Sequence, residues 1–167
     1  MCADVKRSCT IGVYEWDLES FLRALAAADV RLLVDVRQRR GVRGSEYAWA
    51  NAVRLQRALA SVQIEYRHHR ELAPTTELRR LQYAEDDRRG VGKRSRVELA
   101  AVYRERYTRE ILDRVDLSVI VAELPVNGAG ALLCVEADPE ACHRSLIAER
   151  LAREYAVSVK HLRPQRA

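Results

Sequence analysis

Short apolar runs alternate along the chain with stretches of helical periodicity. The apolar runs cover 9–13, 31–36, 64–67, 131–135 and 157–162. Leu32-Leu33-Val34 is continuous, as in parallel strands that are buried on both faces. Strands that alternate with helices favour a parallel sheet with helices on both sides. The sequence therefore predicts an α/β fold, a single domain with a mostly parallel sheet of about five strands and helices on both faces.

Five segments between and after these strands are predicted to be helical. They span about 17–28, 45–60, 76–86, 95–114 and 140–155. Asp17 is a suitable N-cap for the first helix, and Ser95 with Glu98 has the spacing of a capping box for the fourth. The segment 117–124 has apolar residues at helical spacing but is rich in β-branched residues, so helix and strand both stay open there.

The length of 167 residues suits one domain, 1–167, and we expect flexible ends over 1–8 and 164–167. No run of about 18 apolar residues occurs, and the N-terminus lacks a signal-peptide pattern, so we expect a cytoplasmic protein without membrane contact. The four cysteines, at positions 2, 9, 134 and 142, form no CxxC pair. We expect reduced thiols and no metal site. No GxGxxG motif follows the first strand, and no cofactor is expected.

Polar residues gather where the predicted strands end. Asp35-Val36-Arg37 ends the second strand, and Cys134-Val135-Glu136 ends the fourth. Cys142-His143-Arg144 begins the helix that follows the fourth strand. Ligands of open α/β sheets bind beyond the carboxyl ends of the strands. We therefore expect these three segments to meet and to form a site.

Cys142 is the candidate nucleophile, because a helix N-terminus and a neighbouring cation favour the thiolate. Packing between helix and sheet is an equally good explanation for it. His143 is the candidate general acid or base, oriented by Asp35 or Glu136, although it could instead brace the turn. Cys134 is expected to be a core residue.

Arg37 and Arg144 are the candidate anion-binding residues of these segments. An ion pair of Arg144 with Asp35 or Glu136 is the alternative. Such a pair would not exclude a function, because ion pairs of this kind often line sites.

The loop after the second strand is basic. It carries Arg39, Arg40 and Arg43 close to Arg37, and no acidic residue. Because a cluster of arginines repels itself unless an anion is near, we expect these residues to bind an anionic ligand. The chain has a net charge of +5, and 26 of its 29 basic residues are arginine, which suits phosphate groups. A GC-rich genome would also enrich arginine. Tyr47 and Trp49 follow the loop and could stack on bases or pack in the core; the basic loop 88–96 is expected to be solvated.

Together these motifs resemble the pattern of the domain of unknown function 488 family, from Thr10 to Leu162. The resemblance rests on Thr10-Ile11-Gly12, Asp35-Val36-Arg37, Ile64-Glu65-Tyr66 with His68 or His69, and Cys134-x-Glu136 with Cys142-His143-Arg144. Members usually continue the first motif as Gly-His-Ser, where this chain has Val13-Tyr14-Glu15, and many have Leu-Gly-Gly where it has Leu72-Ala73-Pro74. The family has no established activity. The resemblance implies an α/β fold and a polar cleft built on Asp35, Arg37, Glu136, Cys142, His143 and Arg144.

Two functions compete at this point. The first is an enzyme that acts on a phosphate-bearing substrate, either a phosphorylated small molecule or nucleic acid. The second is a nucleic-acid-binding module without catalysis, in which the cluster is structural. A weaker third function is a thiol sensor that uses Cys134 and Cys142. A concave pocket that exposes Cys142 and His143 would favour the enzyme, whereas a sealed network under a flat basic surface would favour binding. The oligomeric state stays open.

Overall fold

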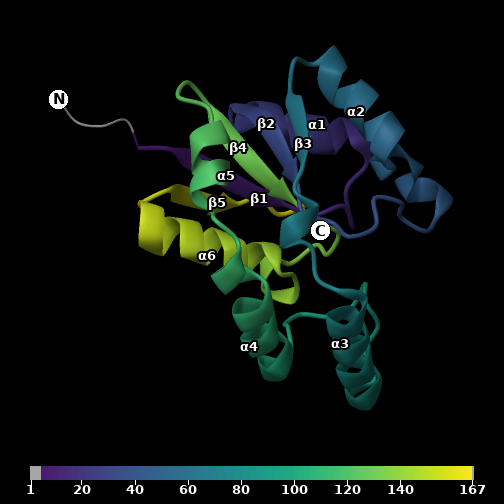
Figure 1. Ribbon diagram of the computed structural model, residues 1–167. Helices are drawn as coiled ribbons and strands as arrows, with labels where there is room; N and C mark the ends of the chain where they lie inside the picture. The colour runs from purple at the N-terminus through teal and green to yellow at the C-terminus, as the bar shows by residue number, and fades with distance from the viewer. Residues whose placement is uncertain (1–4, 167) are drawn as a thin grey trace.

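A sheet of five parallel strands forms the centre of the computed structural model, which describes residues 5–166 (Figure 1). The strands are β1 (Arg7–Ile11), β2 (Val30–Asp35), β3 (Glu65–His68), β4 (Ala129–Leu133) and β5 (Ser158–His161). Their order in the sheet is β3-β2-β4-β1-β5, and every pairing is parallel. The α/β fold predicted from the alternation of strands and helices is confirmed.

Helices cover both faces of the sheet. The helices α1 (Leu18–Ala27) and α2 (Ala52–Ser61) lie on one face, and α5 (Ser118–Glu123) and α6 (Arg144–Tyr155) lie on the other (Figure 1). The chain moves in one direction across the sheet from β1 to β3 and returns for β4 and β5. Because parallel crossovers are right-handed, this reversal places the later helices on the opposite face.

Between β3 and β4 the chain forms a pair of helices that lies beyond the edge of the sheet where the strands end. These are α3 (Thr76–Arg89) and α4 (Ala101–Glu110), which contact each other below the strands in Figure 1. Thr75 caps α3 by accepting a hydrogen bond from the Leu78 amide, and Gly90 ends it in the left-handed conformation. Short 3₁₀ segments connect other elements: η1 (Ser45–Ala50), η2 (Arg70–Leu72), η3 (Leu112–Arg114) and η4 (Pro139–Ala141).

The register of the sheet determines where the site forms. β4 lies between β2 and β1, and all five of its residues are buried. Leu133, the last residue of β4, is paired with Ile11 at the end of β1 and with Asp35 at the end of β2. The segments that follow these three strands therefore leave the sheet side by side.

The predicted helix 95–114 is shorter than expected, because α4 begins only at Ala101. Ser95 does not open a helix; its hydroxyl accepts a hydrogen bond from the Gly92 amide at 2.9 Å. Arg96 is buried and forms an ion pair with Asp86 of α3. The ion pair holds this segment in a loop against α3, so the capping-box pattern is overridden by tertiary contacts.

The predicted helix 45–60 is interrupted at Asn51. There the backbone is extended, with φ of −67° and ψ of 141°, and the side-chain oxygen accepts a hydrogen bond from the Val42 amide at 2.9 Å. The chain therefore forms η1 and then α2 instead of one helix. The segment 117–124, for which helix and strand were both open, is the helix α5.

The described residues near both termini are held by the fold. Arg7 and Ser8, expected to belong to a flexible end, begin β1, and Arg166 forms an ion pair with Glu15. Residues 1–4 and 167, which also belong to the ends expected to be flexible, lie outside the described residues, and so does Cys2. Within 5–166, no helix has the length and apolar character needed to cross a membrane.

Candidate active site

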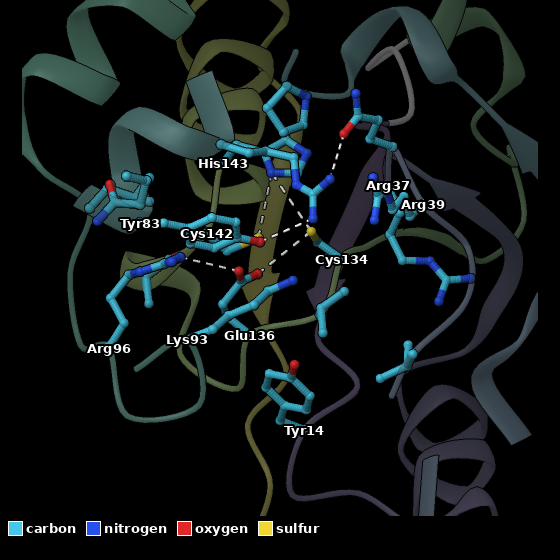
Figure 2. A pocket seen from close by; sticks show the side chains of 18 of the residues that line it. Tyr14, Arg37, Arg39, Tyr83, Lys93, Arg96, Cys134, Glu136, Cys142 and His143 are labelled. Carbon is cyan, nitrogen blue, oxygen red and sulfur yellow. Dashed lines mark hydrogen bonds and ion pairs between the residues drawn. The ribbon is translucent and has the colours of Figure 1, made fainter. Parts of the chain in front are cut away.

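A pocket of about 450 Å³ opens at the edge of the sheet where β1, β2 and β4 end. The loops after these strands form one side of it, and α3, α4 and the loop between them form the other. Its polar lining comprises Tyr14, Arg37, Gln38, Arg39, Arg43, Arg79, Gln82, Tyr83, Lys93, Arg96, Tyr103, Cys134, Glu136, Cys142 and His143. The thiols and the carboxylate lie centrally, with basic side chains on either side (Figure 2).

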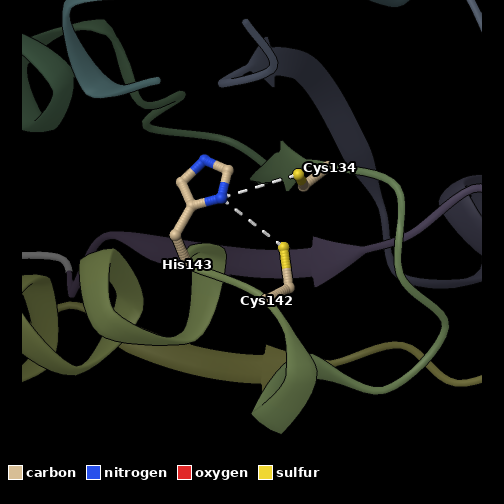
Figure 3. A group of neighbouring side chains, drawn as sticks. All are labelled: Cys134, Cys142 and His143. Atoms are coloured by element: carbon tan, nitrogen blue, oxygen red, sulfur yellow. Dashed lines mark hydrogen bonds between the residues drawn. The ribbon is translucent and has the colours of Figure 1, made fainter. Parts of the chain in front are cut away.

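Two thiols and one imidazole meet on the floor of this pocket. Cys134 directly follows β4, and Cys142 and His143 lie between η4 and α6. The Nδ1 atom of His143 is 3.7 Å from the Cys134 sulfur and 3.8 Å from the Cys142 sulfur (Figure 3). All three residues are buried. Cys134 is therefore part of the site, whereas the sequence predicted only a core residue.

A backbone carbonyl fixes the orientation of the imidazole. The Nε2 atom of His143 lies 2.9 Å from the carbonyl oxygen of Val36. A carbonyl oxygen can only accept, so Nε2 carries a proton and Nδ1 faces the two thiols. This contact brings Asp35-Val36-Arg37 and Cys142-His143-Arg144 together, as expected from the strand ends, although through a main-chain group.

The charges around Cys142 favour its thiolate. Burial would raise the pKa of the Cys142 thiol, but the contact with Cys134 and the positive charges of Arg144 and His143 lower this pKa well below its ordinary value. Burial and the neighbouring Cys142 raise the pKa of Cys134 well above its ordinary value. Burial would lower the pKa of His143, but the negative charge of Cys142 raises it. The arrangement suits a Cys142 thiolate beside a His143 imidazolium.

A glycine and an arginine fix the position of the loop after β4. A Cβ atom on Gly12 would collide with the carbonyl oxygen of Glu136, so only glycine allows this approach. Arg144 donates hydrogen bonds to the carbonyl oxygens of Glu136 and Ala137, at 2.6 and 3.1 Å. These contacts fix the backbone that carries Glu136 into the pocket.

Glu136 is joined to α3 through a buried arginine. Its carboxylate accepts a hydrogen bond from Arg96 at 3.2 Å, and Arg96 also binds Asp86 at 3.0 Å. Burial and the negative charge of Cys142 raise the pKa of Glu136, while the charges of Lys93 and Arg96 oppose the shift. The carboxylate is therefore a group that can carry a proton beside the thiols.

Asp35 and Arg37 form a buried ion pair. The Arg37 guanidinium donates to both Asp35 oxygens, at 2.9 and 2.8 Å, and to the carbonyl oxygen of Ala50 at 2.9 Å. The Tyr66 hydroxyl also donates to Asp35. Asp35 therefore lies against Arg37 and Tyr66. The sequence predicted that Asp35 or Glu136 would orient the His143 ring, but this ring contacts the Val36 carbonyl.

Arg144 is fully buried and bound by the protein. Besides the two carbonyls of the β4–η4 loop, it donates to the Thr10 hydroxyl at 3.4 Å. Among residues 5–166 it forms no ion pair with Asp35 or with the Glu136 carboxylate, which was the alternative expected from the sequence. Its positive charge lowers the pKa of Cys142, while its N–H groups donate to backbone carbonyl oxygens.

The basic loop after β2 divides between the pocket and the surface. Arg39 and Arg43 are exposed and line the pocket, whereas Arg40 donates to the Tyr66 hydroxyl at 3.4 Å and lies outside the lining. Lys93, from the loop 88–96, lines the opposite wall. Within the described part of the chain, Lys93, Arg39 and Arg43 form no ion pair, in contrast to Arg96. These three cations are available to an anion.

The aromatic residues after the basic loop pack within the protein. The Trp49 ring lies 4.8 Å from the Phe21 ring, and the Tyr47 ring lies 5.2 Å from the Tyr14 ring. Both Tyr47 and Trp49 are partly buried against the core. Core packing, the second of the two roles expected for them, accounts for both residues.

Sequence reasoning missed several residues of the pocket. Cys134 could have been found from its place at a strand end, two residues before Glu136. Lys93 and Arg96 were assigned to a solvated loop, and Arg79 and Tyr83 had no signal at all, because their place depends on how α3 folds over the sheet edge. Neither His68 nor His69 joins the thiol cluster: His68 contacts the Arg37 carbonyl, and His69 contacts Glu71 and Glu123.

Comparison with known families supports the resemblance seen in the motifs. Residues 17–151 match the family described as domain of unknown function DUF488. The chain belongs to the DUF488 family. The match includes every candidate residue of the DUF488 pocket, from Asp35 to Arg144. No curated protein and no solved structure matches the chain.

Proposed function

We propose that this DUF488 protein is an enzyme that acts on an anionic, phosphate-bearing substrate, with Cys142 as the nucleophile and His143 as its proton acceptor. One observation carries the proposal. The Nδ1 atom of His143, the ring nitrogen that can accept the thiol proton, lies 3.8 Å from the Cys142 sulfur on the floor of a concave pocket. A thiol beside a fixed base, at the bottom of a cavity, is the arrangement that nucleophilic catalysis requires.

The proposed step begins with transfer of the Cys142 thiol proton to Nδ1 of His143. The thiolate then attacks an electrophilic carbon of the substrate, so that a sulfur–carbon bond forms and the bond to the leaving group breaks. His143 returns its proton to the leaving group. Attack on phosphorus is disfavoured, because neither Cys134 nor Cys142 is followed by an arginine six residues later.

The substrate's charge is assigned from the pocket wall. Lys93, Arg39 and Arg43 face the cavity from two sides, and none of them is paired with a carboxylate among residues 5–166. Such cations repel one another, and an anionic ligand between them would reduce that repulsion. A phosphate group bound there would hold the substrate in the same cavity as the Cys142 thiol.

Nucleic-acid binding without catalysis is the competing function, and the exposed Arg39 and Arg43 are what favours it. Single-strand binding would gain from side chains on which bases can stack, but Tyr47 and Trp49 are packed into the protein. The concave pocket with its thiols supports the enzyme. Steeply salt-dependent binding of single-stranded or double-stranded oligonucleotides, unaffected by Cys142→Ser, would support the competing function.

The pocket's charge can be tested with two alkylating reagents, iodoacetate and neutral iodoacetamide, on protein kept metal-free with a chelator. We expect the iodoacetate-to-iodoacetamide rate ratio at Cys142 to exceed that of free cysteine by about tenfold, because the cations concentrate the anion. Lys93→Gln and Arg43→Gln should lower the ratio and leave the iodoacetamide rate nearly unchanged.

Arg88→Gln is the matched control, since it removes the same charge from an exposed side chain that is paired with Glu85. It should leave the ratio unchanged. A wild-type ratio equal to that of free cysteine would overturn the proposed anionic substrate.

A further inference from the structure

Three soft metal-ligating atoms converge on the floor of the pocket. The sulfur atoms of Cys134 and Cys142 and the Nδ1 atom of His143 all lie within 4.8 Å of one another (Figure 3). They come from positions 134, 142 and 143, so no paired sequence spacing announces them. Thiolate and imidazole together are the donor set that zinc prefers.

The distances between these atoms suit an ion placed among them. Zinc binds thiolate sulfur at about 2.3 Å and imidazole nitrogen at about 2.0–2.1 Å in a tetrahedral arrangement. These lengths give a sulfur–nitrogen separation of roughly 3.6 Å. The observed separations are 3.7 Å from Cys134 and 3.8 Å from Cys142 to the His143 nitrogen. Both sulfur–nitrogen separations therefore lie close to those around a bound ion.

The far side of the imidazole is also held as in a metal site. Nε2 of His143 donates a hydrogen bond to the Val36 carbonyl oxygen at 2.9 Å. The lone pair of Nδ1, which faces the two sulfurs, is therefore the one that can bind an ion. Histidines that bind metals usually donate their other ring N–H to a carbonyl or carboxylate, and this bond fixes the ring. The ring orientation thus exists before any ion arrives.

We propose that Cys134, Cys142 and His143 bind one zinc-like divalent ion with its fourth coordination position open to the pocket. Three protein ligands and one open position characterise zinc sites that contact small molecules. The Glu136 carboxylate lies 3.7 Å from the Cys134 sulfur and lines the same pocket. Two thiolates balance the two charges of the ion, which permits burial of the site.

Ion binding releases protons from the cluster. Without the ion, the cluster holds two protons, either on two thiols or on one thiol and the imidazolium. With the ion, both sulfurs are thiolates and Nδ1 is unprotonated, so two protons leave for solvent.

The consequence for activity rests on the proposed function. A Cys142 sulfur that is bound to the ion donates electron density to the metal and attacks carbon more slowly than the free thiolate, so the ion-bound form is the less active form of the enzyme. The ion and the electrophile compete for the same sulfur atom.

Titration of metal-free, reduced protein with Co²⁺ tests the site directly, because tetrahedral cobalt with thiolate ligands absorbs visible light and shows sulfur-to-metal charge-transfer bands. We expect one equivalent to bind with these bands, and one equivalent of Zn²⁺ to remove them. Cys134→Ser and His143→Gln should each weaken binding at least about tenfold. Cys9→Ser is the matched control, since Cys9 is a buried thiol of β1 outside the cluster, and it should bind like the wild type.

A second measurement keeps the test valid where a variant does not fold. One equivalent of Zn²⁺ on the wild-type protein should protect Cys134 and Cys142 together from iodoacetamide, as mapped by peptide mass. Failure of folded protein to bind either ion, or alkylation that zinc leaves unchanged, overturns the proposal. The proposed function is distinguished from it, because the charge-selective alkylation is measured in chelator and does not depend on the ion.

Discussion

Two groups of basic residues lie at the same edge of the sheet and differ in what holds them. Arg37 and Arg144 are buried, with their guanidinium groups bound to Asp35 or to backbone carbonyls. We call these two the buried arginines. Lys93, Arg39 and Arg43, the pocket cations, face the cavity without an ion-pair partner among the described residues. A cation whose donors are taken supports the fold, and an unpaired cation on a cavity wall is available to a ligand.

The largest expected difference between the two groups is in stability. Arg37→Ala leaves the buried Asp35 carboxylate without its partner, so we expect it to lower the free energy of unfolding by about 3–5 kcal/mol. Lys93→Gln, the comparison variant, removes a pocket cation and should change that free energy by no more than about 0.5 kcal/mol. Urea unfolding of both variants measures the difference. Equal losses would mean that the two groups do not differ in role.

Substitution of Gly12, which allows the loop after β4 to pack closely, should have an effect of intermediate size on the free energy of unfolding. Gly12→Ala places a methyl group against the Glu136 carbonyl, and the loop must move, at a cost of about 1–3 kcal/mol. The Cys134 and Glu136 side chains move with it, so alkylation of Cys142 should also slow. Gly92→Ala is the control, because its new Cβ would meet nothing closer than 3.9 Å. If both variants have the same free energy of unfolding, the close approach at Gly12 does not contribute to stability.

The smallest effect is expected at His69, which does not line the pocket. Burial would lower its pKa, but the carboxylates of Glu71 and Glu123, at 2.6 and 2.7 Å, raise it above the ordinary value. A pKa that is raised in the folded state gives stability that is fully present below about pH 6.5 and is lost as pH rises through the folded pKa. The contribution should be about 1 kcal/mol or less, because Glu71 is half-exposed.

Urea midpoints at pH 6 and pH 9 measure this term at His69. We expect the wild type to exceed His69→Gln at pH 6 and to approach it at pH 9. A difference that grows with pH would show that the two carboxylates do not stabilise the charged imidazole.

Much of the fold could be predicted from the sequence, because strand positions follow from local apolar patterns. Helix boundaries failed where one distant contact decided them. Ser95 and Glu98 have capping-box spacing, yet the pairing of Arg96 with Asp86 holds the segment in a loop. Asn51 likewise breaks a periodic segment through its contact with Val42.

The site could be predicted only in part. Parallel strands bring Asp35-Val36-Arg37 and Cys142-His143-Arg144 to one edge, and the two segments do meet there. Their contact is between His143 and the Val36 carbonyl, and a main-chain group leaves no mark in the side-chain pattern. The place of Lys93 on the opposite wall depends on how α3 and α4 stand against the sheet, which local periodicity does not encode.

The central claim is that Cys142 and His143 form a reactive pair in a cationic pocket. Limited alkylation of metal-free protein with less than one equivalent of iodoacetate, followed by peptide mapping, tests it most directly. We predict that the label appears first on Cys142 and that His143→Gln slows its appearance by about 100-fold, the scale of a positioned base. Labelling of Cys134 or Cys9 before Cys142, or an unchanged rate in folded His143→Gln, would contradict the claim.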